Sequence, residues 1–177
     1  QNTDGSWEEP SEIDEFNPPE WMKPGELRAK VLSTARAGFW LAKLGYSDDS
    51  RVIEACDFLL KFAHPDGHFF GFLNTNWLAA SLISMSMGRE HWAVRGALSY
   101  LVRIPAETWR PANLASLLWS LASAGFRAED REVSHFISIL RKLQLEDGSF
   151  EHSHAEDPVE VTLQVIKGLK WVGAYPG

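Results

Sequence analysis

A short segment recurs along this chain at a nearly constant interval. Residues 144–150 read Gln-Leu-Glu-Asp-Gly-Ser-Phe, and residues 1–7 are a near copy, Gln-Asn-Thr-Asp-Gly-Ser-Trp. Residues 65–69 keep the Asp-Gly-x-aromatic part, and residues 105–109 keep only the aromatic end. From Phe69 to Trp109 is 40 residues, and from Trp109 to Phe150 is 41. A fixed period of this size indicates a repeat protein, in which each repeat is one supersecondary unit.

The residues of this segment suit a joint between helices. Asp-Gly favours a tight turn, because glycine adopts positive φ without a steric cost. The glutamine amide has donors and an acceptor that can tie the end of one helix to the start of the next. The aromatic ring can fill the joint between neighbouring hairpins. A plain turn is the alternative interpretation, but the Gln-x-x-x-Gly-x-aromatic form occurs twice and with the period.

Two kinds of helix are expected to alternate between these turns. Apolar residues at i, i+3, i+4 and i+7 form a one-sided stripe in three segments, beginning at Val52, Val94 and Val133. Residues 75–87 and 112–124 are instead apolar nearly all round, and residues 27–44 and 158–172 are assigned to the same class. Gly45, Gly88, Gly125 and Gly173 follow these helices as stops. The sequence therefore predicts an all-α fold with three complete hairpins and one unpaired inner helix.

The Gln-x-x-x-Gly-x-Trp/Phe segment followed by an apolar helix resembles the repeat, or QW motif, of the terpene cyclases of the squalene-hopene type and of protein prenyltransferase β-subunits. The resemblance covers nearly all of the chain except residues 8–26. It implies an α/α toroid, in which outer and inner helices alternate around a central apolar cavity. It also implies a long apolar isoprenoid-like ligand. Fold alone does not fix activity, so whether the chain is an enzyme stays open.

The number of hairpins corresponds to roughly half of such a ring. An open arc exposes apolar flanks at its ends and along its inner face, and patches of that kind mark interfaces. A homodimer, or additional repeats in a longer parent chain, would complete the ring.

The N-terminal segment carries the charge excess of the chain. Residues 1–26 hold eight acids and one base, whereas the remainder has 16 of each. The absence of a basic patch argues against nucleic acid as a partner. Residues 8–26, with four prolines, predict an extended surface loop held by Phe16 and Trp21; a lid or an acidic cation-binding rim is the alternative. Residues 27–177 are expected to hold the toroid repeats, in a single domain overall.

Localisation is predicted from what the sequence lacks. No apolar run is long enough for a transmembrane segment, and no signal peptide is recognisable. Cys56 is the only cysteine, so an internal disulfide is excluded and a reducing compartment is compatible. The expected location is the cytoplasm, with peripheral membrane association as the alternative.

The cyclases of the resembled family use an Asp-x-Asp-Asp acid before an inner helix, and that motif is absent here. Residues 73–76 are Leu-Asn-Thr-Asn and residues 110–113 are Arg-Pro-Ala-Asn. Only the last such site is acidic, so Glu156, Asp157 and Glu160 are the candidate catalytic acids. The alternative for Asp157 and Glu160 is a capping box around Pro158 at the start of a helix.

A metal site is the weaker possibility at the same place. His152 and His154, with Glu156, are candidate ligands for zinc or magnesium, although no cofactor is otherwise expected. The Asp-x-Cys pair of the prenyltransferase zinc site is missing, and Cys56 lies on an apolar stripe that favours the core.

The candidate lining of an apolar cavity comes from large side chains of the inner helices. These are Phe39, Trp40, Trp77, Met85 and Trp119. Three functions follow from the sequence. The leading one is an isoprenoid- or terpenoid-handling protein that binds or converts a long apolar ligand. The alternatives are a non-catalytic helical-repeat interaction module and a metal-dependent enzyme using His152 and His154.

Overall fold

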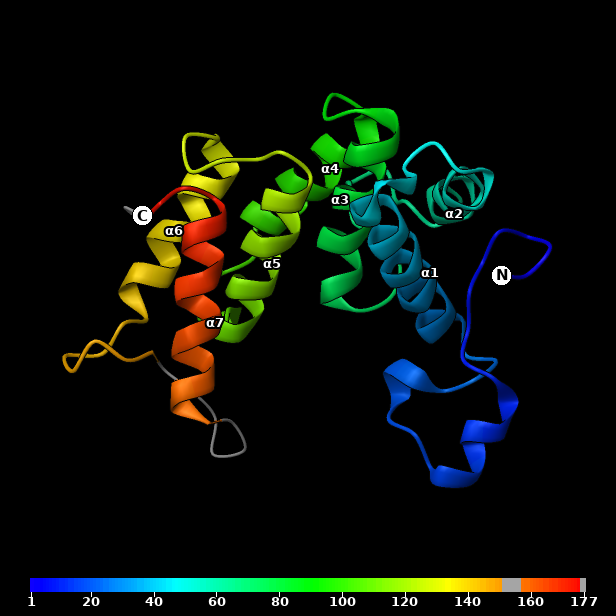
Figure 1. Ribbon diagram of the computed structural model, residues 1–177, viewed down its shortest axis with the longest axis horizontal. Helices are drawn as coiled ribbons and strands as arrows, with labels where there is room; N and C mark the ends of the chain where they lie inside the picture. The colour runs from blue at the N-terminus through cyan, green and yellow to red at the C-terminus, as the bar shows by residue number, and fades with distance from the viewer. Residues whose placement is uncertain (151–156, 176–177) are drawn as a thin grey trace. The chain divides into compact units, whose positions relative to one another are not determined.

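The computed structural model describes residues 1–150 and 157–175, and all regular elements in that part of the chain are helical. The α-helices are α1 (Leu27–Leu41), α2 (Ser50–Leu60), α3 (Leu73–Met87), α4 (Trp92–Val102), α5 (Pro111–Ser123), α6 (Arg131–Lys142) and α7 (Pro158–Trp171), as Figure 1 shows. Three short 3-10 helices, η1 (Ser11–Phe16), η2 (Glu20–Met22) and η4 (Ala106–Thr108), and one π-helical turn, η3 (Ala42–Tyr46), join them. The all-α prediction is confirmed.

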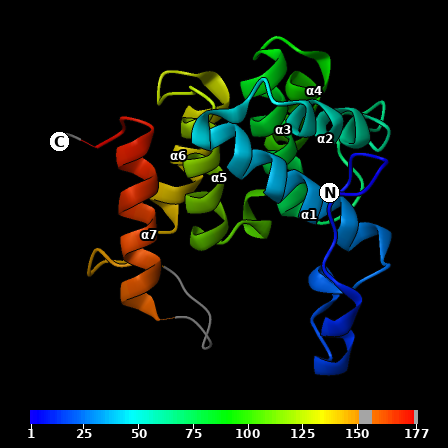
Figure 2. The ribbon, with the colours of Figure 1, turned by 45° about the vertical axis from the view of Figure 1, so that its right-hand side comes forward.

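The helices form two compact units, which contain residues 1–101 and 102–177. In the first unit α1 packs against α2 and α3, and α2 also contacts α3. In the second unit α5 packs against both α6 and α7, which lie beside it in Figures 1 and 2. Each unit has its own buried aliphatic and aromatic core. Leu32, Phe39, Leu59 and Leu82 belong to the first, and Leu114, Leu118, Leu121 and Phe136 to the second.

The predicted difference between the two kinds of helix is visible in their burial. Every residue from Thr75 to Ser84 of α3 is buried, whereas α2 buries one face. At α7 the pattern differs from the prediction, because this inner-type helix is buried on one face only, through Val161, Val165, Gly168 and Leu169. No further helix of the described chain covers its other face.

Aspartate side chains cap two of the described helices. Asp49 caps α2, where its Oδ1 accepts a hydrogen bond from the Arg51 N–H at 2.9 Å. The Arg51 guanidinium also donates to this carboxylate and lowers the pKa of Asp49 to about 2. Asp157 caps α7 in the same way, with Val159 as donor at 2.8 Å. The glycines predicted as stops, Gly45, Gly88, Gly125 and Gly173, all have positive φ.

The acidic loop of residues 8–26 is held differently from the prediction. Phe16 is 81% exposed, so the expectation that it anchors the loop is wrong. Trp21 does make a contact, because the Arg36 guanidinium of α1 lies 5.0 Å from its ring centroid. An ion pair of 3.2 Å between Glu8 and Lys30 of α1 adds a second attachment.

Candidate functional site

The three Asp-Gly turns have the same internal hydrogen-bond network. In each, the aspartate Oδ1 accepts from the backbone N–H two residues later, at 3.0 Å for Asp4, 3.3 Å for Asp66 and 2.9 Å for Asp147. The same oxygen lies 2.6 Å from the side-chain donor atom of Ser6, His68 or Ser149. These side-chain bonds are the main reason why the pKa of each carboxyl lies below its usual value. The repeat predicted from the sequence is therefore a repeat of structure as well.

Glutamine adds the same bond to the first and last turns. Gln1 Nε2 donates to the Gly5 carbonyl at 3.0 Å, and Gln144 Nε2 donates to the Gly148 carbonyl at 3.0 Å. Ala63 takes the glutamine position in the middle turn, since its bridge to Phe69 matches the bridge from Gln144 to Phe150. Glutamine was expected to tie the end of one helix to the start of the next. Gln1 Nε2 also donates to the Arg51 carbonyl at the start of α2, at 2.9 Å. Gln144, which follows α6, bonds within its own turn and reaches no helix start among the described residues.

The first two turns each press a glycine against a helix. A Cβ on Gly5 would clash with the Glu54 carbonyl of α2. Gly67 meets Gly96 of α4 so closely that a Cβ on Gly96 would lie 2.9 Å from the Gly67 Cα. Both turn glycines are buried by these contacts. At both positions glycine is thus required for two reasons, the positive φ and the close approach of a helix.

Two buried polar side chains of the inner helices anchor the same turns, and the sequence analysis did not single them out. The Trp7 N–H donates to Thr34 Oγ1 of α1 at 2.8 Å, and the Phe69 N–H donates to Asn76 Oδ1 of α3 at 2.7 Å. Asn76 lies in residues 73–76, where the Asp-x-Asp-Asp motif is absent, and it bonds to the backbone groups of Phe69, Phe72 and Leu73. Thr34 lies 27 residues after Trp7 and Asn76 only 7 residues after Phe69, so no common spacing in the sequence marks the two anchors.

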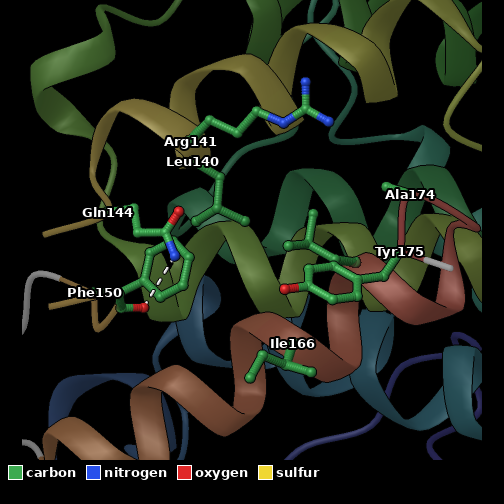
Figure 3. Close-up of a pocket in the computed structure, with 9 residues that line it drawn as sticks. Leu140, Arg141, Gln144, Phe150, Ile166, Ala174 and Tyr175 are labelled. Carbon is green, nitrogen blue, oxygen red and sulfur yellow. Dashed lines mark hydrogen bonds between the residues drawn. The ribbon is translucent and has the colours of Figure 1, made fainter. Parts of the chain in front are cut away.

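The turn at residues 144–150 differs from the other two in its surroundings. Gln144 and Gly148 are exposed, and a Cβ on Gly148 would meet only Gln144 Nε2, at 4.0 Å. Among the described residues, Gln144 has no helix carbonyl corresponding to that of Arg51. A cavity of about 150 Å³ lies beside it instead, between the end of α6, the turn and α7 (Figure 3). Its walls include Leu140, Phe150, Ile166 and Leu169, with Arg141 and Gln144 as polar groups. Counting the decayed turn at residues 105–109, the turn at residues 144–150 is the fourth along the chain, so we call this cavity the fourth-turn groove.

Apart from Ile166 and Leu169, which line the groove, α7 also exposes large apolar side chains. Val159 is 64% exposed, Leu163 49% and Trp171 54%, and Tyr175 beyond the helix is also exposed. Tyr175 lines the groove on the side opposite Gln144 in Figure 3. Val159, Leu163 and Trp171 share the exposed face of α7 with Glu160, Gln164, Lys167 and Lys170.

No family model, curated protein or solved structure matches this chain.

The predicted catalytic acids that the structure describes have ordinary structural contacts. Asp157 is the cap of α7 and Pro158 is its first residue, as the capping interpretation predicted. Glu160 accepts a hydrogen bond from Gln164 Nε2 at 3.2 Å and does not close the predicted capping box. Glu156, His152 and His154 lie outside the described residues. Within residues 1–150 and 157–175, no three His, Cys, Asp or Glu side chains gather in a way that could hold a metal ion.

The predicted cavity residues occupy different environments. Phe39 and Trp77 are buried in the first unit, whereas Trp40 is 46% exposed and lies under the Lys43 ammonium at 5.2 Å. Met85 and Trp119 are half-buried. None of the five lines the fourth-turn groove, nor a second, open cavity of about 170 Å³ beside the acidic loop, which Glu20, Lys23, Glu26, Arg28 and Phe72 line.

Cys56 is a core residue, as its position on the apolar stripe of α2 predicted. Its side chain is fully buried, and burial raises the pKa of the thiol to about 12. A thiol of this kind is neutral at physiological pH. None of the described helices combines the length and the hydropathy that a membrane span needs.

Proposed function

We propose that this chain is a helical-repeat interaction module with the repeat of an α/α toroid, and that it binds a protein partner through the end formed by α7 and the turn at residues 144–150. The observation that carries the proposal is the exposed apolar flank of α7. In α3, by contrast, all ten residues from Thr75 to Ser84 are buried, and α1 exposes large apolar side chains only near its two ends, at Leu27 and Trp40. A helix that leaves Val159, Leu163 and Trp171 in water gains stability when a partner covers them.

The size of the fourth-turn groove supports a protein partner over a lipid. Sites for drug-sized ligands enclose about 300–1,000 Å³, and this groove has about 150 Å³. It suits one or two apolar side chains inserted from a partner surface. Of the candidate acids that the structure describes, Asp157 caps α7 and Glu160 bonds to Gln164.

Site-specific photocrosslinking tests this proposal. Benzoylphenylalanine is placed at Leu163, and the intact chain is irradiated in extract of the organism that makes it. The control places the same group at Ile53 of α2, which is 42% exposed and so comparable to Leu163. We expect a discrete crosslinked species from position 163 and none from position 53. Equal, diffuse crosslinking from both positions would refute the proposal.

A second candidate, the handling of an isoprenoid-like ligand, is supported by the repeat resemblance and by Phe39 and Trp77 on inner-type helices. Native mass spectrometry of the purified chain separates the two candidates. A retained apolar adduct of a few hundred daltons, displaced by a prenyl alcohol, would favour ligand binding. A bare polypeptide, together with crosslinking at position 163, would favour the interaction module.

A further inference from the structure

The chain contains three Asp-Gly pairs, one in each of the turns that share the internal hydrogen-bond network, and no Asn-Gly pair. Asp-Gly is the sequence in which an aspartyl residue isomerises most readily, because glycine has no side chain to hinder attack by its own backbone nitrogen. We infer that Asp147 is a site of spontaneous isoaspartate formation in the folded chain. The same reaction is suppressed at Asp4 and Asp66, because helices cover their turns.

The reaction needs no group outside the turn except water. The Gly148 nitrogen attacks Cγ of the protonated Asp147 carboxyl, so that an N–Cγ bond forms. The proton of this nitrogen and one carboxyl hydroxyl leave as water, and the product is a five-membered succinimide. Water then adds to one of the two ring carbonyl carbons and breaks the bond from that carbon to nitrogen. Attack at Cγ restores aspartate, attack at the former peptide carbon gives isoaspartate, and no group is oxidised or reduced.

Ring closure requires the turn to open at the same hydrogen bonds in all three cases. The glycine N–H donates to the carbonyl three residues earlier, at 3.1 Å for Gly5, 2.9 Å for Gly67 and 3.0 Å for Gly148. The aspartate Oδ1 is held by the residue that follows the glycine in each turn. Because these bonds match, they slow the reaction about equally and do not decide between the three sites.

The packing of the first two glycines restrains the opening of their turns. Gly5 is pressed against the Glu54 carbonyl of α2. Gly67 is pressed in the same way against the backbone of Gly96 in α4. The backbone of neither glycine can rotate toward the succinimide geometry unless a helix moves.

The glycine of the last turn has no such restraint among the described residues. The nearest atom that a Cβ on Gly148 would meet is Gln144 Nε2, at 4.0 Å. A reaction that needs local opening proceeds at a rate set by the free energy of that opening. Asp147 is therefore the aspartate whose turn opens most readily.

Two buried hydrogen bonds hold the first two turns further. The Trp7 N–H, three residues after Asp4, donates to Thr34 Oγ1 at 2.8 Å. The Phe69 N–H, three residues after Asp66, donates to Asn76 Oδ1 at 2.7 Å. Thr34 and Asn76 are both buried. These anchors lie far enough from the aspartates that one turn can be loosened without a change to its own sequence.

Isomerisation at Asp147 changes the surface beside the fourth-turn groove. In isoaspartate the main chain runs through Cβ and Cγ and gains one atom, and the carboxylate is attached to Cα. The bond from the Ser149 N–H to the Asp147 side chain is lost, together with the spacing that lets Gln144 reach the Gly148 carbonyl. The modification acts on the region proposed to bind a partner, but its formation does not depend on that proposal.

Peptide mapping of the intact 177-residue chain tests the inference. The folded chain and a sample in guanidinium chloride are incubated side by side near physiological pH and temperature. Electron-transfer fragmentation then locates isoaspartate in the peptides that contain residues 4, 66 and 147, and a sample digested at time zero corrects for isomerisation during preparation. Thr34→Val, which removes the buried acceptor of the first turn and keeps the size of the side chain, is mapped in the same way after circular dichroism has shown that it is folded.

We expect isoaspartate at position 147 of the folded chain to accumulate at least about tenfold faster than at positions 4 and 66. In guanidinium chloride the three positions should react at comparable rates, since only the contacts with the helices distinguish them. Thr34→Val should raise the rate at position 4 about fivefold, which is the loss of one hydrogen bond, and leave positions 66 and 147 unchanged.

Three results would overturn the inference. The first is an equal rate at the three positions of the folded chain, whether that rate is fast or undetectable. The second is a faster reaction at position 4 or 66 than at position 147. The third is an unchanged rate at position 4 in folded Thr34→Val, since the covering contacts would then not be what suppresses the reaction.

Discussion

The contact between Gly67 and Gly96 gives a quantitative test of how the turns hold the helices. Both partners are backbone, so a methyl group added at Gly67 cannot be accommodated by the rotation of a side chain. The turn or α4 must move. Gly67 also has φ 97°, which an alanine adopts only with strain.

Gly45 is the control position, because a substitution there introduces the backbone strain of a positive φ without a contact to a helix. It has the same φ of 97° and lies in the same compact unit, and a Cβ there would meet nothing within 4 Å. Gly45→Ala should therefore lower the free energy of unfolding by about 1–2 kcal/mol, the cost of a left-handed conformation for a residue with a Cβ. Gly67→Ala should cost about 1–3 kcal/mol more, the usual penalty for overpacking.

Urea unfolding followed by far-UV circular dichroism measures both variants against the unaltered chain. A shift of the midpoint at constant slope reports a change of stability and not of the unfolded state. If Gly67→Ala is no less stable than Gly45→Ala, the contact between Gly67 and Gly96 of α4 does not contribute to stability, and the proposed role of the turns in positioning the helices is wrong.

Three other outcomes are expected from individual side chains. Cys56 is buried and its pKa is raised, so at pH 8 it should react with a thiol reagent only as fast as the chain opens, whereas in urea it should react at the rate of a free thiol. The contribution of this thiol to stability should be present below pH 9 and lost as pH rises toward 12. Asp157→Ala should lower stability by ~1 kcal/mol through loss of the α7 cap, whereas Glu160→Gln should leave the melting temperature unchanged. Asp147 has a lowered pKa, so its stabilising effect is present above pH 4 and lost as pH falls through the folded value; Asp147→Asn should flatten that part of the acid denaturation curve.

The sequence predicts the helices well because their signals are local. The apolar stripe of α2, the all-round burial of α3 and the Asp157 cap depend on spacings within one segment, and the structure has all three. Phe16 was predicted wrongly because an aromatic residue in a loop has no periodic neighbours that show where it points.

The candidate site was harder to predict, because it depends on what covers a turn. Residues 1–7 and 144–150 share Gln, Asp, Gly and Ser at the same places and form the same internal hydrogen bonds, yet one glycine is buried and the other is exposed. This difference comes from α2, which lies about fifty residues along the chain from the first turn. Long-range packing of this kind leaves no mark in the segment itself.

The boundary between the two compact units clarifies what the repeating element is. The first unit ends at Leu101, just before the end of α4, and it contains two sets of turn, inner helix and outer helix. In each set the turn contacts the outer helix of the same set, Gly5 with α2 and Gly67 with α4. In both sets, therefore, the turn contacts the outer helix of its own repeat.

The same definition explains the composition of the second unit. Its first set consists of the decayed turn, α5 and α6, with Trp109 against Phe136 taking over the role of the glycine contact. Its second set has a complete Asp-Gly turn and the inner helix α7, and the described residues contain no outer helix for it. Within the part of the chain that the structure describes, the decayed turn contacts an outer helix and the intact turn contacts none. Among the described residues, Gln144 and Gly148 act within their own turn, through the bond to the Gly148 carbonyl and the positive φ of Gly148, and neither meets an outer helix.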